Sequence, residues 1–108
     1  MDLRMNTPQT ATEPSVFGLI GRMVALPGRR AELIEALSAG SVDLPGCVSY
    51  VIAEDVADPD ALWITEAWES EQAHRASLDL PQVQQAIAIG RPLIASMDGH
   101  PTRPVSGL

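Results

Sequence analysis

The chain has 108 residues, which is room for one domain. It carries 14 acidic and 7 basic side chains, giving a net charge of −7, and all the basic side chains are arginine. This balance argues against a nucleic-acid binder, which needs basic side chains to neutralise phosphates, and against docking on an anionic membrane surface. Hydrophobic residues make up 45% of the chain, which is enough for a packed core.

Cysteine content and the N-terminal sequence indicate the compartment. Cys47 is the single cysteine, which excludes an intramolecular disulfide, and small secreted domains usually carry several. Residues 1–15 are polar and lack the apolar segment of a signal peptide, and no run has the length of a membrane span. We therefore expect a cytoplasmic protein with a flexible N-terminal arm over residues 1–15 and one domain over residues 16–105.

Apolar patterning predicts the elements of the first two thirds of the chain. Residues 16–26 are apolar and partly β-branched, which is typical of a buried strand. Residues 29–39 have helical spacing of their leucine and isoleucine side chains and are followed by a glycine stop. Residues 47–56 and 61–69 are predicted to be two strands of a hairpin, joined by a short acidic loop.

The last third is predicted to contain one interrupted helix and a strand. Ser70 is a suitable N-cap for a helix that runs to about Asp79. Pro81 interrupts that helix, which resumes through Ile87 and extends as far as Ile94 if Pro92 does not end it. The last dozen residues include Pro101, Pro104 and Gly107, which favours a short edge strand and a trailing arm.

The resulting order, β-α-β-β-α-β, predicts a ferredoxin-like α+β fold with helices on one face of an antiparallel sheet. The other face of such a sheet needs cover, and in a chain this short a second copy of itself is the simplest cover. We therefore expect a homodimer whose two sheets face each other.

Common cofactor motifs are missing from the sequence. His74, His100 and Cys47 are far apart and do not have metal-ligand spacing. The sequence contains no glycine-rich phosphate loop, no GxSxG and no HExxH. It therefore gives no support for a metal, nucleotide or flavin cofactor.

The segment 63–74 has the highest density of candidate functional residues. Strand alternation places Glu66 and Trp68 on one face and Trp63 on the other, so the two tryptophans do not share a pocket. His74, in the following helix, is expected to lie near Trp68. Alternatively, Trp68 is only a core anchor, His74 a helix-surface residue and Glu66 an exposed carboxylate at the dimer rim.

Several motifs resemble one known family. These are TEAWESEQAHRASL (65–78), the LPG turn (26–28), PGCVSY (45–50) and the Leu80–Pro81 break. Together they resemble the antibiotic biosynthesis monooxygenase family over about residues 17–96. The resemblance implies a dimeric α+β barrel of ferredoxin-like protomers.

The resemblance also separates the classes within that family. Haem-degrading members carry Asn, Trp and His where this chain has Gly21, Ser77 and Ile87, which argues against haem degradation. The paired histidines of the quinol monooxygenase class fall near Ser77 and Gln82, so that pair is missing as well.

The local sequence is most similar to small enzymes that oxidise anthrones. These enzymes share the WESEQAxR run, with a tyrosine at the position of His74 and a pocket tryptophan matching Trp68. Their pocket Asn corresponds to Ile64, and a pocket His of the second strand falls near Ala53. Only part of their site is therefore present in this chain.

The expected function is that of a monooxygenase that oxidises a small quinol, phenol or anthrone with O2 and uses no cofactor. The candidate catalytic residues are His74 for proton transfer, Trp68 as an aromatic wall and indole N–H donor, and Glu66 as an orienting group or base. The candidate substrate-binding residues are Trp68, Ile64, Gly21, Met23, Ser77 and Ile87. The alternatives are a non-catalytic small-molecule-binding dimer on the same fold and an enzyme of different chemistry, such as an isomerase, on that fold.

Three other side chains are expected to have structural roles. Arg22 is expected to form an ion pair at the dimer interface, and Arg75 to be a solvated helix residue. Tyr50, by alternation with Val48 and Ile52, is expected to pack at the dimer interface.

Overall fold

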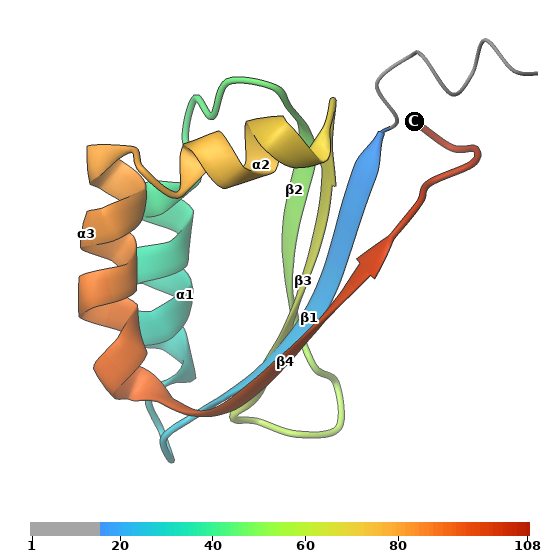
Figure 1. Ribbon diagram of the computed structural model, residues 1–108. Helices are drawn as coiled ribbons and strands as arrows, with labels where there is room; N and C mark the ends of the chain where they lie inside the picture. Colours follow the sequence, from blue (N-terminus) through green and yellow to red (C-terminus); the bar gives the residue numbers. More distant parts are fainter. Residues whose placement is uncertain (1–15) are drawn as a thin grey trace, which may run out of the picture.

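A computed structural model describes residues 16–108, and the predicted N-terminal arm lies outside this range. Four strands and three α-helices follow one another along the chain (Figure 1). Their bounds are β1 (Phe17–Ala25), α1 (Arg30–Gly40), β2 (Cys47–Glu54), β3 (Ala61–Trp68), α2 (Glu71–Ser77), α3 (Pro81–Gly90), the 3-10 turn η2 (Arg91–Leu93) and β4 (Ile94–Thr102).

The strands form one antiparallel sheet in the order β2-β3-β1-β4. The helices lie together on one side of this sheet, with α1 and α3 side by side and α2 across one end (Figure 1). This arrangement confirms the predicted ferredoxin-like α+β fold. It also leaves the other face of the sheet without cover from the helices.

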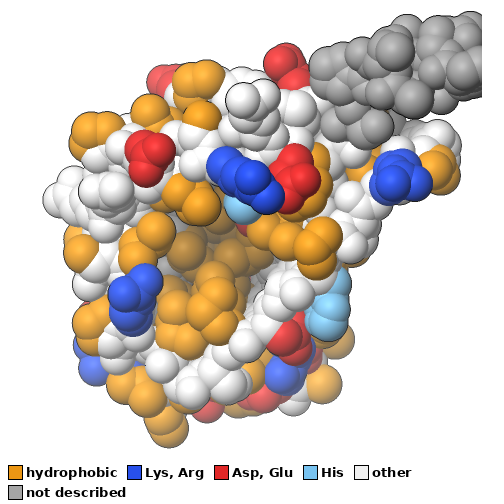
Figure 2. Space-filling model, in the orientation of Figure 1, with side chains coloured by type: hydrophobic (Ala, Val, Ile, Leu, Met, Phe, Trp, Pro, Cys, Tyr) orange, Lys and Arg blue, Asp and Glu red, His pale blue; other side chains and the backbone are white. Residues whose placement is uncertain are grey.

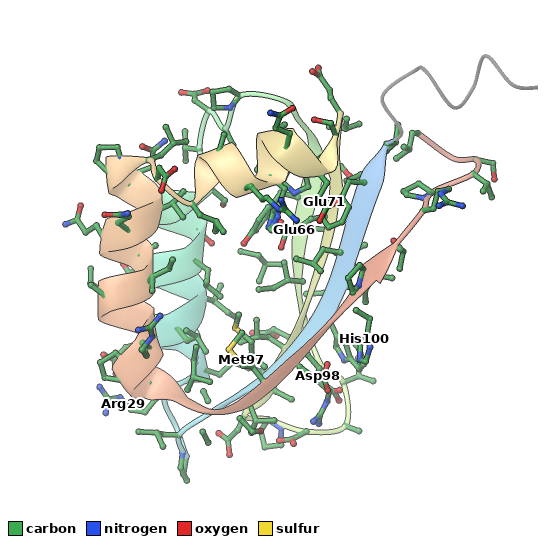
Figure 3. All side chains as sticks on the ribbon, viewed as in Figure 1. Arg29, Glu66, Glu71, Met97, Asp98 and His100 are labelled. Atoms are coloured by element: carbon green, nitrogen blue, oxygen red, sulfur yellow. The ribbon has the colours of Figure 1, made fainter. Side chains whose placement is uncertain are left out.

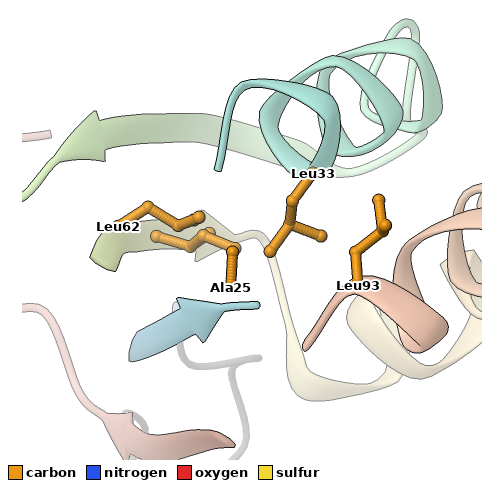
Figure 4. Packing of buried hydrophobic residues seen from close by; sticks show 5 residues of the cluster. Ala25, Leu33, Leu62 and Leu93 are labelled. Carbon is orange, nitrogen blue, oxygen red and sulfur yellow. The ribbon is translucent and has the colours of Figure 1, made fainter. Parts of the chain in front are cut away.

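Aliphatic side chains form the core between the helices and the sheet. Ala25, Leu33, Leu62 and Leu93 meet there together with Ile64 (Figure 4). Leu33 of α1 and Leu62 of β3 are both 0% exposed. Burial of each such side chain stabilises the fold by roughly 1.5–3 kcal/mol, so this cluster holds α1 against β3.

Helices α1 and α3 approach each other closely because small residues lie between them. A Cβ atom added to Gly40 would lie 2.5 Å from the Cβ of Ala86. Gly40 and Ala86 are both buried, so a larger side chain at either position would push the helices apart.

The predicted elements agree with the structure except near the C-terminus. Ser70 caps α2 as predicted, because its Oγ accepts a hydrogen bond of 3.0 Å from the backbone N–H of Ala73. Helix α3 ends at Gly90 and does not reach Ile94, since Pro92 has no N–H to continue the helix.

The last strand is longer than predicted. Strand β4 has nine residues and pairs with β1 from Gly18 to Ala25. Pro101 lies inside β4, which is tolerated because β4 is at the edge of the sheet. Within residues 16–108 no helix is long and apolar enough to cross a membrane.

Candidate functional site

Glu66, Trp68 and His74 meet beneath α2. Glu66 and Trp68 are two residues apart on β3, so both face the helices. The Ser70 cap starts α2 directly after β3, and this turn places His74 back over the end of the strand. The predicted proximity of His74 to Trp68 is confirmed, with ring centroids 5.4 Å apart.

The Glu66 carboxylate is at the centre of this group. Its Oε1 accepts a hydrogen bond of 2.9 Å from Trp68 Nε1 and lies 4.0 Å from His74 Nε2. The Glu66 side chain is only 12% exposed, so it is a buried carboxylate and not the exposed residue of the alternative interpretation. The indole N–H of Trp68 is engaged by Glu66, so it is not free to hydrogen-bond a ligand as proposed from the sequence.

Burial governs the protonation of this carboxylate. It raises the pKa of Glu66 above its ordinary value of 4.5, while the Trp68 hydrogen bond and His74 act in the opposite direction. A carboxylate with a raised pKa is a better proton acceptor than an exposed one. Burial is the largest influence on the pKa of Glu66.

His74 lies between two aromatic rings. Phe17 of β1 is in register with Trp68 of β3, and the centroid of its ring is 5.4 Å from that of His74. Trp68 contacts the same imidazole edge-on and is 1% exposed. These contacts fix the orientation of the imidazole toward Glu66.

A cavity of about 100 Å³ lies next to these residues. Glu66, Trp68 and His74 line it, together with Tyr50 of β2 and Ser77 of α2. Its other walls come from the helices and from the loop after α1: Leu37, Gly40, Ser41, Leu44, Leu78, Val83 and Ala86. This volume is small compared with the roughly 300–1,000 Å³ of most ligand pockets, so it accommodates only one end of an aromatic ligand.

A wider hollow opens between the helices and strands β1 and β4. Figure 2 shows that hydrophobic side chains line it. Glu66 and Met97 both extend into the space between the helices and the sheet (Figure 3). The hollow offers an aromatic ring the room that the small cavity lacks.

Two glycines are paired on the helix-facing side of β1 and β4, the strands beside this hollow. Gly21 of β1 is in register with Gly99 of β4 and with Ile64 of β3, which faces the helices in the core. A Cβ added to Gly99 would have no atom within 4 Å, so the space above it is open. Flat backbone at this pair leaves room for a planar ligand.

The remaining predicted substrate-binding residues occupy different environments. Ser77 lines the cavity and is 5% exposed, but its Oγ donates a hydrogen bond of 2.6 Å to the carbonyl of His74. Ile64 and Met23 belong to the core of the sheet's helix-facing side. Ile87 on α3 is 37% exposed and does not line the cavity.

The prediction that Tyr50 packs at the dimer interface is wrong. Tyr50 is half-buried on the helix-facing side, in register with Glu66, and packs against the core with Ile52. Tyr50 and Ile52 share one side of β2 as predicted, but that side faces the helices. Val48 lies at the register irregularity between Cys47 and Ser49.

Tyr50 and Phe17 are the site residues that the sequence analysis missed. Both were identifiable only from strand register, since Phe17 pairs with Trp68 and Tyr50 pairs with Glu66 across neighbouring strands.

The opposite face of the sheet carries a separate polar cluster. Trp63, which faces away from Trp68 as predicted, donates a hydrogen bond of 2.9 Å to Asp55 Oδ2 and is 39% exposed. Arg22 forms ion pairs with Asp55 at 3.6 Å and with Asp58 at 3.2 Å. The ion pairs of Arg22 are thus within the chain, and whether it also contacts a partner remains a prediction.

Two further side chains are exposed and lie outside the cavity. Arg75 is 73% exposed, pairs with Glu71 and is the solvated helix residue expected. His100 of β4 lies with Asp98 on the side of the sheet away from the helices (Figure 3). Within residues 16–108, no three His, Cys, Asp or Glu side chains are arranged to hold a metal ion.

The elements and their pairing define a ferredoxin-like α+β protein with a cavity between its helices and its sheet. Residues 16–89 match the family model described as antibiotic biosynthesis monooxygenase. The chain belongs to this family.

Solved structures agree with this assignment. The chain is 57% identical to a "putative Antibiotic biosynthesis monooxygenase" from Chloroflexus aurantiacus, with a TM-score of 0.85, covering 87% of this chain and 97% of that one. A protein from Nitrosomonas europaea with the same description is 14% identical, with a TM-score of 0.80 and coverage of 86% and 93%, and shows the shared fold. A Bacteroides thetaiotaomicron protein described as a "Possible Oxidoreductase" is 24% identical, with a TM-score of 0.74 and coverage of 82% and 97%.

None of the curated proteins compared with this chain matches it in sequence.

Proposed function

We propose that this protein is a monooxygenase that oxidises a small aromatic substrate of the quinol, phenol or anthrone type with O2 and without a cofactor. The observation that carries the proposal is the buried Glu66 carboxylate, held by Trp68 beside His74 in the space between the helices and the sheet. Membership of the monooxygenase family supports the reaction class.

The reaction needs only a base and an enclosed apolar surface. An electron-rich aromatic substrate that has lost a proton passes electrons directly to O2. At an anthrone methylene, the carbon loses two hydrogens and becomes a carbonyl. One oxygen atom of O2 enters that carbonyl, and the other leaves as water with the two hydrogens.

The arrangement of the side chains suits this proton transfer. Glu66, with its raised pKa, takes the first proton from the substrate. His74, 4.0 Å from the same carboxylate oxygen, accepts that proton in turn and returns the base to its charged form. Trp68 fixes the carboxylate and forms the aromatic wall of the cavity.

We also propose that the protein is a homodimer. The sheet face away from the helices exposes Trp63 and, on β2, Val51, which is 54% exposed. A sheet in a small domain needs cover on such a face, and a second copy provides it by two-fold symmetry. The two sheets would then pack face to face.

The alternative function is non-catalytic binding of a small aromatic molecule. One observation favours it: Ile64, where related anthrone oxidisers carry Asn, is an apolar residue buried to 4% exposure. This position is therefore apolar and offers a ligand no polar group.

Oxygen uptake with a panel of anthrones and hydroquinones tests the proposal. We expect uptake above the protein-free autoxidation rate, reduced by His74→Ala and by Trp68→Phe. Saturable binding of the same compounds with no uptake would support the binding module instead. Uptake that neither substitution changes would place the reaction elsewhere in the fold.

A further inference from the structure

Tyr50 lines the cavity, and the proposed reaction gives it no role. It faces Glu66 directly across the β2–β3 pairing, where opposed Cβ atoms lie about 4.5–5.5 Å apart. Both side chains line the same cavity of about 100 Å³. The phenol and the carboxylate therefore border one small space.

The hydroxyl of Tyr50 makes no hydrogen bond with any group of residues 16–108, and neither does Oε2 of Glu66. A half-buried phenol usually finds a partner, because an unsatisfied polar group costs roughly 1–3 kcal/mol. An available donor and an available acceptor thus share one cavity between the helices and the sheet. This pairing matches a ligand that carries an oxygen atom and an acidic hydrogen close together.

We propose that Tyr50 donates its phenolic hydrogen to the oxygen substituent of the bound aromatic molecule. This inference rests on the proposed function and names the feature of the substrate that the site recognises, a carbonyl or phenolic oxygen on the ring system. Glu66 takes the proton from the same molecule. The negative charge that develops on the ligand oxygen then receives the Tyr50 hydrogen bond.

The protonation state of Tyr50 supports this role. Burial, and the nearby Glu66 charge, raise the pKa of the phenol, so it stays protonated at neutral pH. Tyr50 is thus a permanent donor, whereas Glu66 is the group that changes charge. A donor aimed at a developing oxyanion typically contributes a factor of about 10²–10³ to the rate.

The chain offers a clean probe, because Tyr50 is its single tyrosine. Incorporation of 3-fluorotyrosine gives one fluorine NMR resonance that reports on this ring alone. Two ligands are compared under argon, where no oxidation occurs: anthrone, and 9,10-dihydroanthracene, which has the same ring system without the oxygen. We expect anthrone to shift the resonance more than dihydroanthracene does.

Tyr50→Phe removes only the hydroxyl. We expect it to weaken anthrone binding by about 3–10-fold, the range of one neutral hydrogen bond, and to leave dihydroanthracene binding unchanged. In air, kcat/KM for anthrone should fall by at least about 10-fold, mainly through kcat. Ser49→Ala, which removes an exposed hydroxyl one residue earlier on β2, is the matched control and should match wild type.

The outcomes separate this inference from the proposed function. If Tyr50 distinguishes anthrone from dihydroanthracene but no oxygen is taken up, the hydrogen bond is supported and the monooxygenase proposal is overturned. Oxygen uptake that Tyr50→Phe leaves unchanged supports the monooxygenase and overturns the hydrogen bond. Equal binding of both ligands by Tyr50→Phe and wild type, or binding of neither ligand by wild type, also overturns the role of Tyr50.

Discussion

Trp68 and Glu66 are joined by a hydrogen bond of 2.9 Å between the indole nitrogen and a carboxylate oxygen, on the same face of β3. Trp68 is 1% exposed, so the bond holds the Glu66 carboxylate at a fixed position inside the protein. A buried carboxylate costs stability unless its hydrogen bonds are satisfied, and here only one oxygen accepts such a bond from the described residues. The buried carboxylate therefore costs folding stability.

Glu66→Gln tests the proposed role of Glu66 as the base. The amide oxygen still accepts the Trp68 hydrogen bond, but the side chain no longer accepts a proton. We expect kcat/KM to fall by about 10²–10⁴-fold, the usual loss of a general base. Glu69→Gln, which changes an exposed carboxylate just after β3, is the control and should keep full activity.

The same variant tests how pH affects stability. The folded-state pKa of Glu66 is raised, so its contribution to stability is fully present below the unfolded pKa of about 4.5 and is lost as pH rises through the folded pKa. Glu66→Gln lacks this loss. In urea unfolding, the free energy of unfolding of Glu66→Gln should therefore increase relative to that of wild type as pH rises from 4 to 8. A difference between the two free energies that stays constant over this range would contradict burial of the charge.

The sequence predicted the strands and the helical region well because apolar spacing, Ser70 and the glycine and proline positions act locally. It placed Glu66, Trp68 and His74 together because alternation and one helix turn are short-range geometry. Tyr50 was misplaced because alternation shows that Tyr50 and Ile52 share a side of β2 but does not show which side faces the helices. That side is set by the pairing of Tyr50 with Glu66 across β2 and β3. The hollow was equally hidden, since Gly21 and Gly99 become neighbours only through β1–β4 pairing.

Gly99→Ala tests whether the hollow holds the ligand. The new methyl group meets no protein atom within 4 Å, so we expect thermal stability to be unchanged or slightly higher. If the ring lies over this glycine pair, the methyl group occupies its space, and anthrone binding should weaken by about 10-fold or more. Binding equal to that of wild type would place the ligand elsewhere.

Gly21→Ala is the contrasting variant at the same glycine pair. Its Cβ would lie 2.7 Å from the backbone oxygen of Asp98, so β1 and β4 must shift apart. We expect a loss of about 1–3 kcal/mol in the free energy of unfolding, the usual cost of overpacking. Chemical denaturation of Gly21→Ala beside Gly99→Ala distinguishes the strained position from the open one.

The outer face of the sheet is the place to test dimerisation. Val51 and Trp63 are exposed there, and Trp63 is also tied to Asp55 by a hydrogen bond of 2.9 Å. Val51→Glu is therefore the better variant, because it adds a charge without breaking a contact within the chain. We expect wild type to be a dimer at micromolar concentration and Val51→Glu to be a monomer by light scattering, since a buried unpaired carboxylate opposes association.

A control variant makes this result specific to the sheet face. Val56→Glu adds the same charge at a fully exposed position in the loop between β2 and β3 and should leave the dimer intact. Circular dichroism should show both variants folded, because neither side chain belongs to the core. A wild-type monomer, or a dimer that Val51→Glu does not weaken, would contradict packing of the two sheets against each other.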